Sequence, residues 1–111
     1  MWSFRELQVY IKWIKELVDQ LDSFSNWVDR ESFLNNLEKM NACFMVLLQI
    51  GETATQIKSH YPDFDWLPIK QMIALRNFVA HQYHKIVPEV IRETIKHDIP
   101  AVKLKVDELL R

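Results

Sequence analysis

Apolar residues recur at helical spacing along most of the chain. The first stretch predicts a helix over residues 3–22, with one apolar face and a charged face opposite it. A start signal precedes this helix, because Ser3 and Glu6 have the spacing of a capping box. The residues expected in the core are Leu7, Tyr10, Ile11, Ile14, Leu17, Val18 and Leu21.

A second apolar pattern predicts a long helix over residues 32–60, with a short helical turn before it, after Asp29. Pro62 follows, and the residue before a proline is pushed out of helical conformation. Gly51, the only glycine, lies inside the pattern, where it costs about 1 kcal/mol relative to alanine. We therefore expect a neighbouring helix to approach closely at Gly51.

Three prolines indicate where the later helices begin. Pro68 suits the first turn of a third long helix, which is apolar around much of its circumference and is expected to be central to the fold. Two further helices are expected over 88–97 and 100–110. One glycine and four prolines disfavour a sheet protein. The sequence therefore predicts an all-α fold, a small antiparallel helical bundle of about five helices, in a single domain over 1–111.

Composition restricts where the protein works. The single cysteine, Cys43, lies in a seven-residue apolar run that is too short to cross a bilayer, and an unpaired thiol suits a reducing compartment. The first residues lack the pattern of a secretory signal. We expect a cytoplasmic protein that does not enter membranes. The net charge is −1, but residues 66–97 carry a net +3, so basic character is local.

The densest set of reactive side chains is the segment 76–84, Arg-Asn-Phe-Val-Ala-His-Gln-Tyr-His. Arginine binds phosphate oxygens with a fixed charge, and histidine transfers protons near neutral pH. An imidazole can deprotonate an RNA 2′-hydroxyl for attack on the adjacent phosphorus, while a guanidinium stabilises the developing charge. This chemistry needs no metal, and the sequence has no convincing zinc-site spacing.

Helical geometry separates the two central residues of this segment. Arg76 and His81 point about 140° apart on a straight helix, whereas Arg76 and Tyr83 differ by about 20°. The helix must therefore distort near its end, or a second protomer must complete the site. We favour a symmetric dimer. The bare Arg-x4-His spacing is weak evidence, because Arg92 and His97 repeat it.

The wider context is more specific. The combination of Ile50-Gly51-Glu52, Arg76-Asn77-x3-His81-x-Tyr83 and Asp98-Ile99-Pro100 resembles the HepT-like family of HEPN ribonucleases, over residues 47 to 104. The resemblance implies an HEPN-like dimeric fold in which Arg76 and His81 are catalytic and Asn77 supports them. It also implies the toxin of a toxin-antitoxin pair.

The same resemblance implies a partner, a minimal nucleotidyltransferase antitoxin that transfers AMP to Tyr83. Phosphate added there would occupy the anion site and block RNA. The chain departs from the family pattern at His84-Lys85, which we treat with Lys70 as candidate RNA contacts. Glu52 either pairs with Arg76 across helices or is a simple surface residue.

The leading hypothesis is a metal-independent endoribonuclease toxin that needs no cofactor, acts as a homodimer and is neutralised by its nucleotidyltransferase. An alternative is a non-catalytic helical module that binds such a partner or a nucleotide, with Tyr83 as the acceptor. A third is a dimeric scaffold in which the motif has no role. Loss of RNA cleavage in Arg76→Ala and His81→Ala variants separates the first from the others.

Overall fold

The computed structural model describes residues 4–25, 30–64, 69–81 and 88–110, and within these ranges all regular structure is helical. The helices, in chain order, are α1 (Phe4–Ser25), α2 (Arg30–Leu34), α3 (Leu37–His60), α4 (Ile69–His81), α5 (Pro88–His97) and α6 (Ile99–Leu109). The predicted all-α bundle is confirmed. None of the helices in these ranges is long and apolar enough to span a bilayer.

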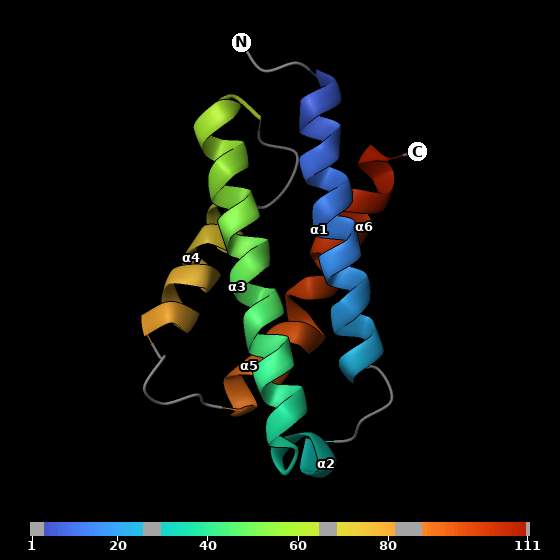
Figure 1. Cartoon of the computed structure of the whole chain (residues 1–111), viewed down its shortest axis with the longest axis vertical. Helices are drawn as coiled ribbons and strands as arrows, with labels where there is room; N and C mark the ends of the chain where they lie inside the picture. Colours follow the sequence, from blue (N-terminus) through green and yellow to red (C-terminus); the bar gives the residue numbers. More distant parts are fainter. Residues whose placement is uncertain (1–3, 26–29, 65–68, 82–87, 111) are drawn as a thin grey trace.

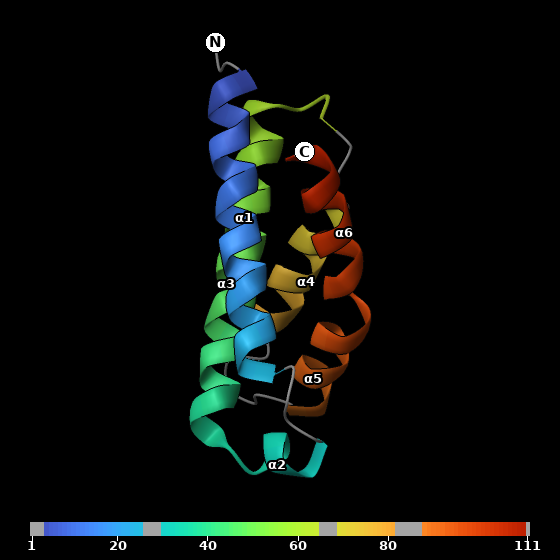
Figure 2. The same cartoon turned by 90° about the vertical axis from the view of Figure 1, so that its right-hand side faces the viewer.

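Helix α3 is the centre of the fold. It runs antiparallel to α1 on one side and packs against α4 on the other, while α2 closes one end of the bundle (Figure 1). From the side, α1 and α3 form one layer, and α4, α5 and α6 form a second (Figure 2). Ten residues of α3 are buried, because this helix contacts α1 in its own layer and α4 and α5 in the other layer.

The apolar face predicted for the first helix is confirmed in α1. Leu7, Ile11, Ile14, Leu17, Val18 and Leu21 are buried, and Tyr10 is half-buried. The helix ends three residues later than expected, at Ser25. The polar residues near its end are accommodated inside the helix, since Ser23 Oγ donates to the Gln20 carbonyl (2.8 Å) and Asp22 accepts from Lys103 Nζ of α6 (2.6 Å). That hydrogen bond raises the pKa of Lys103. Ser3 lies outside the described residues.

The second predicted helix, 32–60, is wrong at its start. The structure has the short helix α2, as expected after Asp29, and then a break before α3. Asn36 is the N-cap of α3 and its Oδ1 accepts from the Lys39 amide (3.0 Å). An asparagine side chain that accepts a hydrogen bond from a first-turn amide favours the start of a new helix over continuation of the previous one, so the helix is interrupted at Asn36. The end at His60 is confirmed.

The expectation that the third long helix is central is also wrong. Among the residues of α4 whose side chains are described, Met72 is buried, whereas Gln71 and Ala74 are exposed and Phe78 is 45% exposed. Apolar residues around a helix predict burial, but they fit a helix with an uncovered apolar face equally well. Helices α5 and α6 lie within one residue of their predicted ranges. Cys43 is fully buried, as expected.

Candidate functional site

Helices α3 and α4 come into tight contact at Gly51 and Arg76. A Cβ atom at position 51 would overlap Arg76 Cβ and lie 2.6 Å from Arg76 Cγ and 3.2 Å from Arg76 Cα. Non-bonded carbon atoms prefer separations of about 3.5–4.0 Å. Only glycine therefore allows the Arg76 side chain to cross α3 at this distance, and the predicted close approach of a neighbouring helix is confirmed.

The guanidinium of Arg76 is held from two sides. Its Nη2 lies 2.5 Å from Glu52 Oε1, and its Nη1 donates to Asn77 Oδ1 (3.1 Å). The Arg76 side chain is 37% exposed and the Glu52 side chain 51% exposed, so the ion pair faces solvent. Of the two alternatives for Glu52, the structure selects the cross-helix pair with Arg76.

Arg76 is also incompletely satisfied. Its Nε atom is buried and has no hydrogen-bond partner among the described residues. A guanidinium carries five N–H donors, and the two contacts above engage one each on Nη1 and Nη2. The group therefore retains donors for an anionic ligand while its stem is fixed against α3.

His81 is the last residue of α4. The helix is α-helical without interruption from Ile69 to His81, so positions 76 and 81 are about 140° apart around the helix axis, as expected for a five-residue separation. The expected alternative of a distorted helix is not observed in this range. Within one protomer α4 places Arg76 toward α3 and the His81 position on another side of the helix.

The remaining predicted site residues are distributed unevenly. Lys70 is exposed in the first turn of α4, about 9 Å before Arg76 along the helix axis, and the two are not brought together. Tyr83, His84 and Lys85 lie outside the described residues. Among the described residues, no group of three or more histidine, cysteine, aspartate or glutamate side chains could hold a metal ion.

The second Arg-x4-His pair, Arg92 and His97 on α5, has different contacts from the pair on α4. Glu93 lies between Arg92 and His97 and contacts both, with Arg92 Nη1 at 3.5 Å and His97 Nε2 at 2.8 Å from its carboxylate oxygens. These contacts all lie within α5, whereas Arg76 contacts a second helix. Arg92 is therefore a natural internal control for Arg76.

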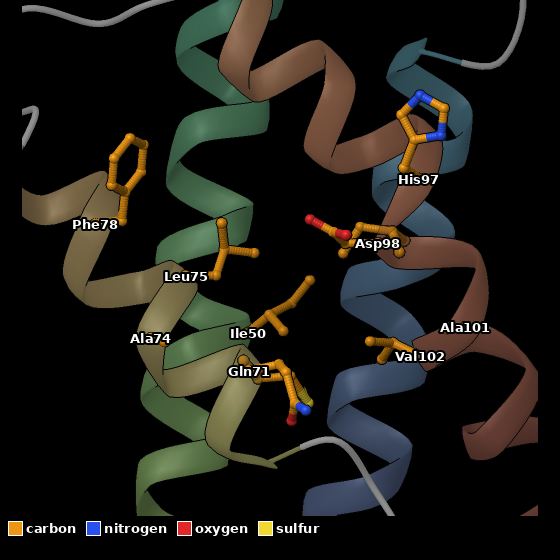
Figure 3. Close-up of a pocket in the computed structure, with 11 residues that line it drawn as sticks. Ile50, Gln71, Ala74, Leu75, Phe78, His97, Asp98, Ala101 and Val102 are labelled. Carbon is orange, nitrogen blue, oxygen red and sulfur yellow. The ribbon is translucent and has the colours of Figure 1, made fainter.

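A cavity of about 500 Å³ lies between α4 and the corner where α5 meets α6 (Figure 3). Sequence reasoning missed it. The signal that could have found it is the stripe Gln71, Ala74, Leu75 and Phe78, which lies on one side of α4 at spacings of three and four residues. We call this cavity the α4/α6 groove. Its lining residues are Ile50, Gln71, Met72, Ala74, Leu75, Phe78, His97, Asp98, Ile99, Ala101 and Val102.

Comparisons with known proteins agree with the resemblance found in the sequence. The model of the family described as "Ribonuclease HepT-like" matches residues 14–109. A protein of Methanocaldococcus jannaschii named "Putative RNase MJ1380" is 28% identical over 106 residues, which cover 95% of this chain and 97% of that protein. One of Thermococcus cleftensis named "Probable ribonuclease HepT" is 28% identical over 104 residues, covering 90% and 92%. No solved structure matches the chain significantly.

Proposed function

The chain belongs to the HepT-like ribonuclease family and is a ribonuclease by that membership, and on this premise we propose that it is a metal-independent endoribonuclease toxin that uses Arg76 and His81. The observation that carries the proposal is the anchoring of Arg76. Gly51 lets its stem cross α3, while Glu52 and Asn77 orient its guanidinium. A fixed guanidinium costs little reorganisation when charge develops on a phosphate.

The proposed reaction is an internal transesterification. The imidazole of His81 accepts the proton of the 2′-hydroxyl, the O2′–P bond forms, and the P–O5′ bond breaks. The departing 5′-oxygen takes up a proton from water, and His81 releases the proton that it accepted to solvent, which leaves a 2′,3′-cyclic phosphate and a 5′-hydroxyl. Arg76 stabilises the negative charge that grows on the non-bridging phosphate oxygens.

Glu52 supports this reaction and also competes with the substrate. Its carboxylate contacts Nη2 of Arg76 and is half-exposed, so an incoming phosphate meets both the guanidinium and a negative charge beside it. Phosphate and carboxylate bind the same type of donor. We infer that Glu52 holds Arg76 in place before RNA arrives and that its ion pair loosens when the phosphate binds.

We propose that a homodimer completes the site. Since α4 is regular through His81, positions 76 and 81 of one protomer lie on different sides of the helix, which favours a site shared between two protomers. Two copies that face each other across a cleft would pair His81 of one protomer with Arg76 of the other.

We further propose that a minimal nucleotidyltransferase antitoxin neutralises the enzyme by transferring AMP from ATP to the hydroxyl oxygen of Tyr83, with pyrophosphate as the leaving group. Position 83 would lie about 20° from Arg76 if the helix continued, so the added phosphate would compete for the same guanidinium. Mass spectrometry of the protein expressed with and without such a partner tests this step. An unmodified Tyr83 in a neutralised complex would contradict it.

The central test is cleavage of total cellular RNA by purified protein in excess EDTA. Removing the proton acceptor in His81→Ala is expected to slow cleavage by roughly 10²- to 10⁴-fold, and Arg76→Ala is expected to impair both binding and turnover. Arg92→Ala, which changes the matching arginine of α5, is expected to cleave like the unmodified protein. Unchanged cleavage by both motif variants would refute the mechanism. Intact RNA with an unmodified Tyr83 would favour the non-catalytic partner-binding module.

A further inference from the structure

The α4/α6 groove has apolar walls and few polar groups. Ile50 of α3 lines it from below, Leu75 and Phe78 from α4, and Ile99 and Val102 from α6. A cavity of about 500 Å³ is within the range of small-ligand sites, which are mostly apolar with a few polar groups that fix orientation. The 45% exposed Phe78 ring lies at one side, where a flat ligand could stack on it (Figure 3).

Asp98 is the one carboxylate among the described residues that line the groove. It is the N-cap residue of α6, but its backbone is in the helical region and its side chain makes no capping hydrogen bond. An aspartate at this position usually accepts from an amide of the first turn. Here the carboxylate points away from the α5–α6 backbone toward the space in front of α4 (Figure 3). Within the described part of the chain, the Asp98 carboxylate thus makes no capping hydrogen bond, and it lies beside an apolar surface.

The groove lies beside the proposed catalytic motif. Phe78 is between Arg76 and His81 in the sequence, and His81 follows it by three residues, about 4.5 Å along α4 and 60° around it. Arg76 lies on nearly the opposite side of the helix from Phe78. A ligand in the groove would thus be next to the His81 position of its own protomer and not next to Arg76.

We propose that the α4/α6 groove binds a nucleobase of the RNA substrate, with the base stacked on Phe78 and its exocyclic amino group donating to Asp98. This inference rests on the proposed ribonuclease function. Single-stranded RNA bases are commonly recognised by aromatic stacking together with hydrogen bonds to their edges. A carboxylate accepts from the amino groups of guanine, adenine and cytosine. Uracil has none and presents two carbonyl oxygens, so the groove selects against it.

The first measurement is calorimetric titration of the full-length protein with GMP, AMP, CMP and UMP. UMP is expected to bind about 10-fold more weakly than the best of the other three, the discrimination that one charged hydrogen bond supplies. Phe78→Ala should weaken binding of every nucleotide about 10-fold, and Phe78→Trp should restore it. Equal affinity for all four nucleotides, or no effect of Phe78→Ala, would overturn the proposal.

Asp98→Ser tests the role of the carboxylate by removing it. Serine is a good N-cap residue, and the present Asp98 side chain makes no capping bond, so α6 is expected to remain folded. The variant should bind UMP and the amino-bearing nucleotides equally. Glu16→Gln, which neutralises an exposed carboxylate on α1, and Trp13→Ala, which removes an exposed aromatic there, serve as matched controls that keep the discrimination.

Mapping the cleavage positions in RNA separates this proposal from the ribonuclease proposal. If the unmodified protein cleaves RNA and Asp98→Ser relaxes the base preference at the cut, both stand. Cleavage with an identical preference in Asp98→Ser refutes the base site and leaves the nuclease intact. Discriminating nucleotide binding by protein with an unmodified Tyr83 that cleaves no RNA supports the base site and refutes the catalytic proposal.

Discussion

Replacing Gly51 by alanine is expected to displace Arg76 and to give no gain in stability, although alanine is the better helix former. The added methyl group would overlap Arg76 Cβ and lie 2.6 Å from Arg76 Cγ. Ordinary carbon contacts need about 3.5 Å, so α4 must move away from α3 by more than about 1 Å to relieve the overlap with Arg76 Cβ. Cβ is fixed by the backbone and cannot rotate out of the way, whereas Cγ can move if χ1 of Arg76 changes.

The magnitude follows from two opposing terms. Alanine gains about 1 kcal/mol in helix propensity over glycine. Overpacking a tight contact costs about 1–3 kcal/mol, so the free energy of unfolding should change by between no net effect and a loss of about 2 kcal/mol. The effect on catalysis is expected to be larger, because a misplacement of about 1 Å in a catalytic group can cost about 100-fold in rate.

The assay is urea unfolding followed by circular dichroism, together with RNA cleavage, for a double-mutant cycle. Arg76→Gly removes both Cβ and Cγ and leaves only Cα, at 3.2 Å from the position of the new methyl group. In that background Gly51→Ala should increase the free energy of unfolding by nearly the full propensity gain. The two substitutions should therefore show a coupling of about 1–3 kcal/mol.

One result would refute this reasoning. If Gly51→Ala stabilises the protein by about 1 kcal/mol in both backgrounds, only helix propensity is involved. The two helices would then not be in contact at this position, and the anchoring of Arg76 over Gly51 would have no structural basis.

Two further predictions concern Glu52 and Cys43. Glu52→Ala should lower the single-turnover rate constant of RNA cleavage about 10-fold, because the Arg76 guanidinium is no longer held in place. RNA binding should not weaken, because the substitution removes a negative charge that competes with the phosphate. Stability should change little, since exposed ion pairs contribute about 1 kcal/mol or less. Equal losses in binding and turnover would contradict this role. Burial raises the pKa of the Cys43 thiol from 9.0 to about 11. Above pH 9.0 the thiol of the unfolded chain therefore ionises first, and the free energy of unfolding falls by about 2 kcal/mol by pH 11. Urea unfolding against pH should show a shallower decline for Cys43→Ala, and identical slopes would disprove the assignment.

The sequence predicted the helices well where a helix has one apolar face and one charged face. The buried face of α1 was readable because its apolar residues keep a strict helical period with charged residues opposite. The beginning of α3 could not be predicted, since the N-cap at Asn36 interrupts an apolar pattern that continues on both sides of it. The position of α4 was misjudged because apolar periodicity does not report which partner covers a face.

Some features of the candidate site could likewise be predicted from the sequence, and others could not. The residue types of the motif at Arg76 and His81 follow from the sequence, and so does the need for a close helix contact at Gly51, because an isolated helical glycine requires a compensating reason. Only the tertiary structure decided that the contact is with Arg76, that Glu52 pairs across helices, and that the side chain of Asp98 faces a groove. Local periodicity and backbone conformation depend on neighbours within a few residues. These contacts join residues more than twenty positions apart, and they are set by how whole helices pack.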